Sequence, residues 1–538
     1  MRPNATLRSP AAVTVGRPLS HAAARSRRPL RGNPWLTLAT VSLGVLMVGI
    51  DGTVVSIANP YIARSLHASL ADLQWVTNAY LLALAVLLIA GGKIGDRYGR
   101  KRIFLIGVVG FAASSVGVGV IGTIDGVIAM RTLQGLFGAL LMPNTLALLR
   151  ATFPVERLNQ AVGIWGGTSA LATASGPIVG GLLVEHVSWQ SVFFINAPIA
   201  AITLALGLFA LAENRERLRQ ALDGLGLTLL AGGLFCLVFA FVEGQSWGWG
   251  AARIDALLGG GIALLIAFGL VESRVRAPLI PLRVIRQRSV ALGTLTVMMT
   301  FFAMYGVLFF VSLYLQNVHG LDPVAAGVRT LPLTLVFAIS SPLGALLTGR
   351  LGPRAPIALG LGLTGVALLL LLGLEPSSPY SALWPSFVLL GIGIGLVVVA
   401  STDAIVANAP VDEAGVAGGI QTTAVQLGGV VGTAILGSVL ATQVGAVLAR
   451  SLHAAGVPSS IARQLAAAKE LVGQGATPAL KGASPALAHA VATGSHAAFM
   501  SGLHTALLVA AIVSFLGVAA GLLIRRGRAG AGAHAALL

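Results

Sequence analysis

The stretch GGKIGDRYGRKRIF, from Gly91 to Phe104, decides how the rest of the chain is interpreted. Apolar runs of about twenty residues lie on both sides of it, which is the length that crosses the hydrocarbon core of a bilayer as a helix. Its charges are therefore expected in a short turn between two membrane spans, where glycines let backbones approach closely and turn sharply. Asp96 is the only acid among five basic residues, so we expect it to have a cationic neighbour. Short loops this basic stay in the cytoplasm.

The chain has the composition of a membrane protein with many spans. Of its 538 residues, 56% are hydrophobic and only 10% are charged, a balance that soluble domains do not have. The single Cys236 excludes an internal disulfide framework, and the spacing of the nine histidines does not suggest metal binding, so no metal and no organic cofactor is predicted. The net charge of +17 does not indicate nucleic-acid binding, because most Lys and Arg fall in segments predicted to face the cytoplasm.

Fourteen apolar segments are long enough to span a bilayer. We place them at 35–58, 75–94, 103–123, 126–149, 159–183, 192–212, 224–243, 253–272, 289–315, 325–349, 355–373, 382–404, 415–441 and 501–524. An even number of spans puts both termini on one side of the membrane, and the basic loops place that side in the cytoplasm. The predicted fold is an all-α polytopic membrane protein.

Two short internal sequence repeats indicate that the chain contains two homologous six-helix halves. Pro154–Glu156 recurs as Pro410–Asp412, and the glycine-rich loop at 95–100 has a weaker counterpart at Gly349–Arg354, at nearly the same offset. Halves repeated in parallel are a known transporter architecture. We predict a disordered basic N-terminal tail (1–33), an N-terminal six-helix bundle (34–212), two inserted spans with basic flanking loops (213–288), a C-terminal six-helix bundle (289–524) and a cytoplasmic tail (525–538). The C-terminal bundle includes a long extracytoplasmic loop (442–499), within which residues 459–472 could form an amphipathic helix.

Two charged residues fall inside predicted spans, where a charge costs about 2.5–3.5 kcal/mol and therefore needs a reason. Asp51 lies near the outer end of the first span and Arg131 near the outer end of the fourth, which puts both at about 8–11 Å below the outer surface. We expect them to form a pair or to face a shared aqueous cavity. Burial favours a neutral carboxyl and a guanidinium favours a charged one, so Asp51 can bind and release a proton as access alternates. The alternative is a static ion pair that locks two helices.

Four motifs resemble those of the fourteen-span drug:proton antiporters of the major facilitator superfamily. They are the loop after the second span (91–104), a first-span motif (49–60), a fourth-span motif (131–139) and the antiporter motif of the fifth span (176–181). The resemblance implies two six-helix bundles that rock about a central cavity, plus two inserted helices. It also implies that Asp51 carries the proton and that Arg131 controls its protonation.

The resemblance assigns conformational roles to two of these motifs. The loop after the second span would form a cytoplasmic latch that holds the outward-open state, and the fifth-span motif would shape a hinge or a seal. The residues concerned are Gly92, Gly95, Asp96, Arg97, Gly99, Arg100, Gly176, Pro177, Gly180 and Gly181.

Polar and aromatic residues at membrane depth are candidates for a substrate cavity. We single out Asn78, Tyr80, Gln134, Asn144, Glu243, Phe302, Gln316 and Gln421. Asn196 and the Met- and Phe-rich stretch 298–310 are further candidates, although such a stretch fits a lipid-facing surface equally well.

We therefore predict a proton-coupled antiporter of the cytoplasmic membrane. It would export amphipathic, drug-like compounds by alternating access, as a monomer, with protons and the lipid bilayer as its other partners. Export of a metabolite of the cell itself (an antibiotic, siderophore or lipid precursor) is an alternative, and proton-coupled import is another that the fifth-span glycines disfavour. A phosphate-binding loop is not supported, because Lys93 is followed by Ile94 rather than Ser or Thr. The chain offers no nucleophile–base set that would indicate an enzyme.

Overall fold

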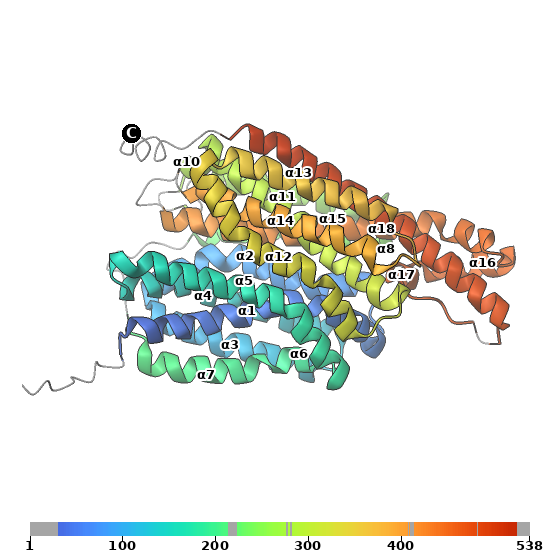
Figure 1. Cartoon of the computed structure of the whole chain (residues 1–538), viewed down its shortest axis with the longest axis horizontal. Coiled ribbons are helices and arrows are strands. Elements are labelled where there is room, and N and C mark those ends of the chain that lie inside the picture. Colours follow the sequence, from blue (N-terminus) through green and yellow to red (C-terminus); the bar gives the residue numbers. More distant parts are fainter. Residues whose placement is uncertain are drawn as a thin grey trace, which may run out of the picture.

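The computed structural model describes residues 31–213, 223–275, 278–279, 282–406, 408, 414–480 and 482–524. The predicted N-terminal tail up to residue 30, the basic loop 215–219, the repeat Pro410–Asp412 and the tail 525–538 lie outside the described residues. Throughout the described residues, every regular element is a helix (Figure 1).

The first half contains seven helices that make six spans. They are α1 (Pro34–Leu66), α2 (Leu70–Tyr98), α3 (Arg100–Val120), α4 (Ile124–Thr152), α5 (Val155–His186), α6 (Ser191–Phe194) and α7 (Asn196–Ala210). The Asn33 side chain accepts the first backbone N–H groups of α1, and Ser69 with Asp72 forms a capping box at the start of α2. Ile195, between α6 and α7, keeps helical backbone angles, so these two helices form one span.

The remaining helices make eight spans and a short helical connection. The inserted pair is α8 (Gly224–Trp247) and α9 (Ala252–Glu272), followed by α10 (Leu282–Ile285). The second half consists of α11 (Arg288–Leu313) continued by the π-helix η1 (Tyr314–Val318), α12 (Pro323–Leu351), α13 (Arg354–Leu370) continued by the 3-10 turn η2 (Leu371–Gly373), α14 (Tyr380–Val406), α15 (Ala414–Ala454), α16 (Ser459–Leu465), η4 (Ala466–Ala468), α17 (Lys469–Gly473) and α18 (Pro485–Leu522). The described residues thus contain 14 segments that are long and apolar enough to cross a membrane, as the sequence predicts.

The two halves are built from the same helix contacts. In the first half α2 and α3 pack against α4, and α1 packs against α5; in the second half α12 and α13 pack against α14, and α11 packs against α15. The halves meet where α5 contacts α12 and where α2 contacts α15, and α8 lies beside both α2 and α15. Figure 1 shows the first half in blue to green below the second half in yellow to red.

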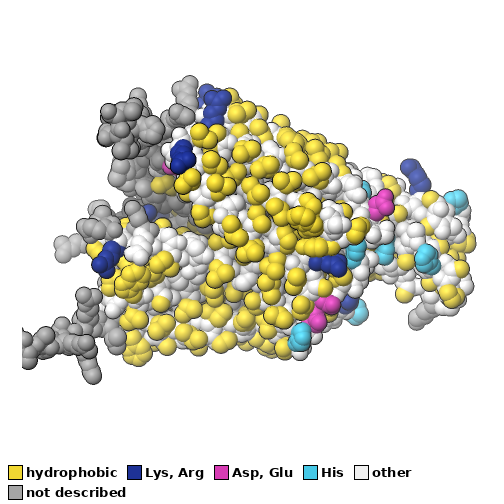
Figure 2. Space-filling view, viewed as in Figure 1, with side chains coloured by type: hydrophobic (Ala, Val, Ile, Leu, Met, Phe, Trp, Pro, Cys, Tyr) yellow, Lys and Arg dark blue, Asp and Glu magenta, His cyan; other side chains and the backbone are white. Residues whose placement is uncertain are grey.

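The molecule has two distinct ends and an apolar flank. We name the end at which α1 begins and α18 ends the terminal end, and the opposite end the far end. In Figure 2 apolar side chains cover the flank between these ends, and the charged side chains on this face gather near them. Large apolar residues within the spans are strongly exposed, such as Leu171 (62%) and Ile339 (65%). A surface of this kind fits a bilayer.

The segment 442–499, expected as a long loop, is largely helical. α15 has 41 residues and α18 has 38; at 1.5 Å per residue they are about 57–62 Å long, roughly twice the thickness of the hydrocarbon core. Both therefore extend past the other helices at the far end, where α16 packs against α15 (Figure 1). The helix predicted at 459–472 is present as α16, η4 and α17. Alanine, which is frequent in this segment, is the strongest helix former, and this explains why the expected loop was too long.

The stretch Gly91–Phe104 is not the short turn that we expected. α2 continues to Tyr98 and α3 begins at Arg100, so Gly99 alone redirects the chain, with φ +111. The basic residues are good helix formers and extend both helices into the expected turn. Gly99 is the position at which the backbone conformation requires glycine.

Gly99→Ala is expected to destabilise the protein by about 1–3 kcal/mol, because a side chain at this φ strains the backbone. An added Cβ would also come within 2.6 Å of the Glu213 carboxylate. Thermal unfolding of the detergent-purified protein measures the effect. Gly122→Ala is the matched control, since its Cβ would meet no atom within 4 Å. Equal melting temperatures for the two variants would contradict this account of the turn.

Candidate functional site

A buried ion pair joins the first and fourth spans. Arg131 Nη1 donates to Asp51 Oδ2 at 2.5 Å, and their side chains are 1% and 0% exposed. The other carboxylate oxygen of Asp51 accepts from Gln134 Nε2 at 2.7 Å and from Asn196 Nδ2 at 3.3 Å. Arg131 also donates to the Val76 carbonyl at 3.1 Å. Both charges are therefore surrounded by hydrogen-bond partners, the condition under which a buried pair is tolerated.

Aromatic rings enclose the guanidinium. The Cζ atom of Arg131 lies 4.1 Å from the centroid of the Tyr80 ring and 5.8 Å from that of Phe193. Such cation–π contacts stabilise a desolvated cation. The Tyr80 hydroxyl is buried and has no hydrogen-bond partner among the described residues. It is thus available to a water molecule or to a substrate.

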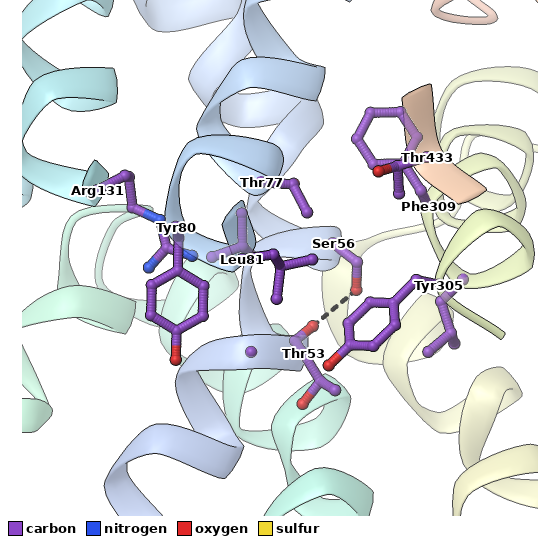
Figure 3. A pocket seen from close by; sticks show the side chains of 12 residues that line it. Thr53, Ser56, Thr77, Tyr80, Leu81, Arg131, Tyr305, Phe309 and Thr433 are labelled. Atoms are coloured by element: carbon purple, nitrogen blue, oxygen red, sulfur yellow. Dashed lines mark hydrogen bonds between the residues drawn. The ribbon is translucent and has the colours of Figure 1, made fainter. Parts of the chain in front are cut away.

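A cavity lies directly beside this pair and is shared by both halves (Figure 3). Figure 3 shows Tyr80 and Arg131 on one side and Tyr305, Phe309 and Thr433 on the other. The complete lining is Gly52, Thr53, Val55, Ser56, Thr77, Tyr80, Leu81, Arg131, Tyr305, Leu308, Phe309 and Thr433. In this conformation the cavity has a volume of about 20 Å³, which is room for about one water molecule. Its aromatic and aliphatic walls, with a few hydroxyl groups and one cation, are of the kind that line small-molecule sites.

Arg131, and not Asp51, is the member of the pair that lines this cavity. The Asp51 carboxylate lies behind it, enclosed by Arg131, Gln134 and Asn196. Arg131 therefore contacts both the cavity and the Asp51 carboxylate.

The predicted cavity residues have different positions in the structure. Tyr80 lines the cavity and Gln134 binds Asp51. The other residues make contacts elsewhere: Asn78 accepts from Thr433 of the second half, Asn144 donates to the carbonyls of Leu140 and Gly91, Glu243 accepts from Trp75, and Gln316 donates to the Ile57 carbonyl. Phe302 is buried, with its backbone against Gly432, and Gln421 is half-buried on α15. Most of them therefore hold helices together in this conformation.

The sequence analysis missed the hydroxyl residues of the cavity. Thr53 and Ser56 lie on one face of α1, and Thr77 and Thr433 come from α2 and α15. Their signal was the helical spacing of polar residues within an apolar span, as at positions 53 and 56. Among the described residues, no three His, Cys, Asp or Glu side chains are arranged to hold a metal ion.

Asp96, near the end of α2, forms an ion pair with Arg100 at the start of α3. Arg100 Nε donates to Asp96 Oδ1 at 2.8 Å, and the Arg97 guanidinium lies over the Tyr98 ring. Gly95 packs against the Asn144 side chain of α4, and Gly92 packs near Pro143 of the same helix. The latch role of this loop stays a prediction.

The glycines of the fifth span are points of close helix approach. Gly176 and Gly180 pack against Thr53 and Val54 of α1, and an added Cβ at Gly181 would be 2.6 Å from the Pro323 carbonyl oxygen of α12. Pro177 lies within continuous helix, and its carbonyl packs against Gly327 of α12. α5 is therefore in close contact with both halves at this level.

Hydrogen bonds between the halves are concentrated toward the far end. Three of them run from Ser312 to the carbonyl of Ser56, from Gln316 to the carbonyl of Ile57 and from Arg64 to Asn317, at 2.6, 3.2 and 2.8 Å. Toward the terminal end of α5, by contrast, an added Cβ at Gly163, Gly166 or Gly167 would meet no atom within 4 Å. This conformation is thus closed at the far end.

Protonation of His319 is expected to destabilise the far end. Burial, with a further contribution from Arg329, lowers the pKa of His319 below its usual value of 6.5. Tyr314 donates its hydroxyl hydrogen to the Glu375 carbonyl, so His319 Nε2 is the donor in its 2.8 Å contact with Tyr314. The unfolded chain binds this proton more readily than the folded one, so stability is lost as the pH falls below 6.5.

Melting curves at pH 8 and pH 5 measure this effect. His319→Gln keeps an N–H donor and lacks the titration, so it should lose less stability than the wild type on acidification. An equal loss in both proteins would refute the role of His319.

The described residues form twelve spans in two halves of matching contacts and two inserted spans, and a buried charge pair lies beside a cavity shared by the halves. These features define a class: polytopic transporters that alternate access. The chain belongs to the Major Facilitator Superfamily, whose family model matches residues 41–433.

The relatives of the chain include several exporters. It is 45% identical to the tetracenomycin C resistance and export protein of Streptomyces glaucescens, over 92% of this chain and 93% of that protein. It is 33% identical to the multidrug efflux pump LfrA of Mycolicibacterium smegmatis, over 93% and 98%. Among solved structures, a bacterial homologue of the human lysosomal transporter Spinster in an inward-facing conformation aligns with a TM-score of 0.60 at 20% identity, over 93% and 99%, which shows a shared fold.

Proposed function

We propose that the protein exports amphipathic, drug-like molecules across the cytoplasmic membrane in exchange for protons, and that Asp51 carries the proton. The observation that carries this proposal is the buried Asp51–Arg131 pair, whose arginine lines a cavity shared by both halves. A charge pair at membrane depth costs free energy, and charged residues at this depth usually mark a functional site. The names of the relatives support export of antibiotics or multiple drugs.

In the proposed cycle, Arg131 connects the state of Asp51 to the cavity. A proton on Asp51 removes the negative charge that holds the guanidinium at 2.5 Å. Arg131 can then turn toward the hydroxyl groups of Thr53 and Tyr80, which border the same cavity. Loss of the proton restores the pair. The position of Arg131 thereby differs between the protonated and deprotonated transporter.

Opening at the far end requires the hydrogen bonds of Ser312, Gln316 and Arg64 to break. We propose that Asp96 and its basic neighbours then hold the terminal end closed, and that Gly176 and Pro177 let α5 move against α1 and α12. Both termini would lie in the cytoplasm, because the basic loops are at the terminal end. One chain contains a complete cavity, so a monomer is sufficient.

Export of a metabolite made by the cell itself is the second candidate. The similarity to a tetracenomycin C resistance and export protein over 92% of the chain favours it specifically. The same cavity and the same charge pair would serve both tasks. Expression together with a biosynthetic gene cluster would distinguish a metabolite exporter from a general drug exporter.

Transport in proteoliposomes tests the proposal. Vesicles with an acidic interior should take up lipophilic cations and neutral dyes through protein inserted with its terminal end outward, and a protonophore should abolish this uptake. Uptake that is independent of the pH gradient would overturn proton coupling. Accumulation only in vesicles with an alkaline interior would indicate import instead.

A further inference from the structure

The loop after the second span and its counterpart in the second half differ in how their charges are neutralised. In the first half Arg100 pairs with Asp96 at 2.8 Å, and Arg102 lies 3.8 Å from the Glu213 carboxylate. Glu213 follows α7 and also accepts the backbone N–H of Lys101 at 3.1 Å. A carboxylate of the chain itself therefore occupies the start of α3.

Lys101 completes this arrangement. Its ammonium donates to the carbonyls of Leu208 and Leu211 at 2.9 and 2.8 Å, at the end of α7. A cation at a helix C-terminus is favourable, since the last carbonyls of the helix lack partners. In the first half, the start of α3 and the end of α7 are thus joined by internal charges.

The second half keeps the backbone of this loop but not its acids. Gly352 has a φ of +78, where Gly99 has +111. At the same offset, Gly349 stands where Asp96 does, and Arg354 stands where Lys101 does. Three residues after the end of α18 the sequence has Arg525, whereas three residues after the end of α7 it has Glu213. The second half therefore has the cations of this corner without the carboxylates.

A cavity lies at this corner, between the starts of α11 and α13 and the end of α18. Its lining consists of Arg288, Leu351, Arg354, Ala355, Leu522, Leu523 and Ile524. Neither arginine pairs with a carboxylate within the described ranges. Leu351, Leu522 and Leu523 are 47%, 44% and 53% exposed. Two guanidinium groups and an apolar rim thus border one space at the terminal end of the apolar flank.

We propose that this cavity binds the phosphate group of an anionic membrane phospholipid. Guanidinium groups bind phosphate through paired hydrogen bonds, and basic pockets between spans recognise anionic headgroups. Arg288 and Arg354 also begin two helices that have no side-chain cap hydrogen bond, and the N-terminus of a helix favours an anion. The exposed leucines provide contacts for acyl chains, which a free phosphate would not use. The lipid replaces the carboxylate that Glu213 supplies in the first half, and this site does not depend on the transported substrate.

Native mass spectrometry and thermal unfolding of the full chain test this site. The probes are phosphatidylglycerol, phosphatidylcholine and inorganic phosphate. The variant Arg288→Gln/Arg354→Gln removes both guanidinium groups, and Arg274→Gln/Arg286→Gln is the matched control, because it removes two exposed charges at the same end that do not line the cavity. Phosphatidylglycerol should bind the wild type and the control and raise their melting temperatures. For the double variant at the cavity we expect affinity about 30-fold lower, roughly fivefold for each arginine.

Three results would overturn the proposal. Phosphatidylglycerol could bind the cavity variant as tightly as the control, which would place the lipid elsewhere. Phosphatidylcholine could stabilise the wild type as strongly as phosphatidylglycerol, which would exclude recognition of charge. Inorganic phosphate could produce the same thermal shift as the lipid, which would indicate a site for a free anion.

Discussion

Asp51→Asn is expected to abolish uphill export while downhill exchange of substrate persists. Asparagine has nearly the shape of aspartate, and its carbonyl oxygen can still accept from Arg131, which donates to Asp51 at 2.5 Å. Its amide group replaces the oxygen that accepts from Gln134 at 2.7 Å, so that hydrogen bond is lost unless the Gln134 amide turns over. Asparagine cannot bind and release a proton, so the pH gradient no longer drives the cycle. When one proton is exchanged per substrate molecule, each unit of pH difference supports about a tenfold substrate concentration gradient. The variant should build up no such substrate gradient.

Proteoliposomes with an imposed pH gradient provide the measurement, and substrate counterflow without a gradient shows that the variant is folded. Asp125→Asn is the control, since Asp125 is an exposed acid in the first turn of α4. A variant at position 51 that accumulates substrate as fast as the wild type would show that Asp51 is not the carrier.

Arg131→Met is expected to cause the largest loss of stability, about 3–5 kcal/mol, because it leaves a buried carboxylate without its partner. The Asp51 side chain is 0% exposed, so water cannot replace the guanidinium without rearrangement of the site. The contact with the Tyr80 ring is lost as well. Transport should also stop, since protonation of Asp51 would no longer change the position of a cation at the cavity.

The double variant Asp51→Asn/Arg131→Met tests whether the loss comes from the pair. It removes both charges, so its melting temperature should be well above that of the single variant Arg131→Met. Arg150→Met, at an exposed position near the end of α4, controls for the loss of an arginine. Additive losses from the two single substitutions would show that the charges are not coupled.

The spans were predictable from the sequence because membrane thickness fixes the length of an apolar helix. All fourteen predicted spans correspond to helices of the structure. The depth of Asp51 and Arg131 followed from counting residues along two antiparallel spans, and the structure places these side chains in contact. The helical extensions at 442–499 were not predictable from hydropathy, because they continue past the apolar segment into residues that fit either a helix or a loop.

The surroundings of the pair depended on tertiary packing. Asn196 donates to Asp51 from a helix 145 positions away in the sequence, and Thr433 reaches Asn78 from the other half. Side chains of this kind look alike in a sequence whether they line a cavity or bind a neighbouring helix. The enclosure of Asp51 behind Arg131 is a property of one conformation of the cycle, and a sequence encodes all conformations at once.

The proposed proton carrier, the single carboxylate of Asp51 behind Arg131, has an electrical consequence. A turnover that brings in one proton and releases a neutral compound moves one net positive charge across the membrane. The membrane potential then contributes about 2.3 kcal/mol per 100 mV to export. If the compound is a monovalent cation, the two charges cancel and the potential contributes nothing. We therefore expect the same transporter to generate current with some compounds and none with others.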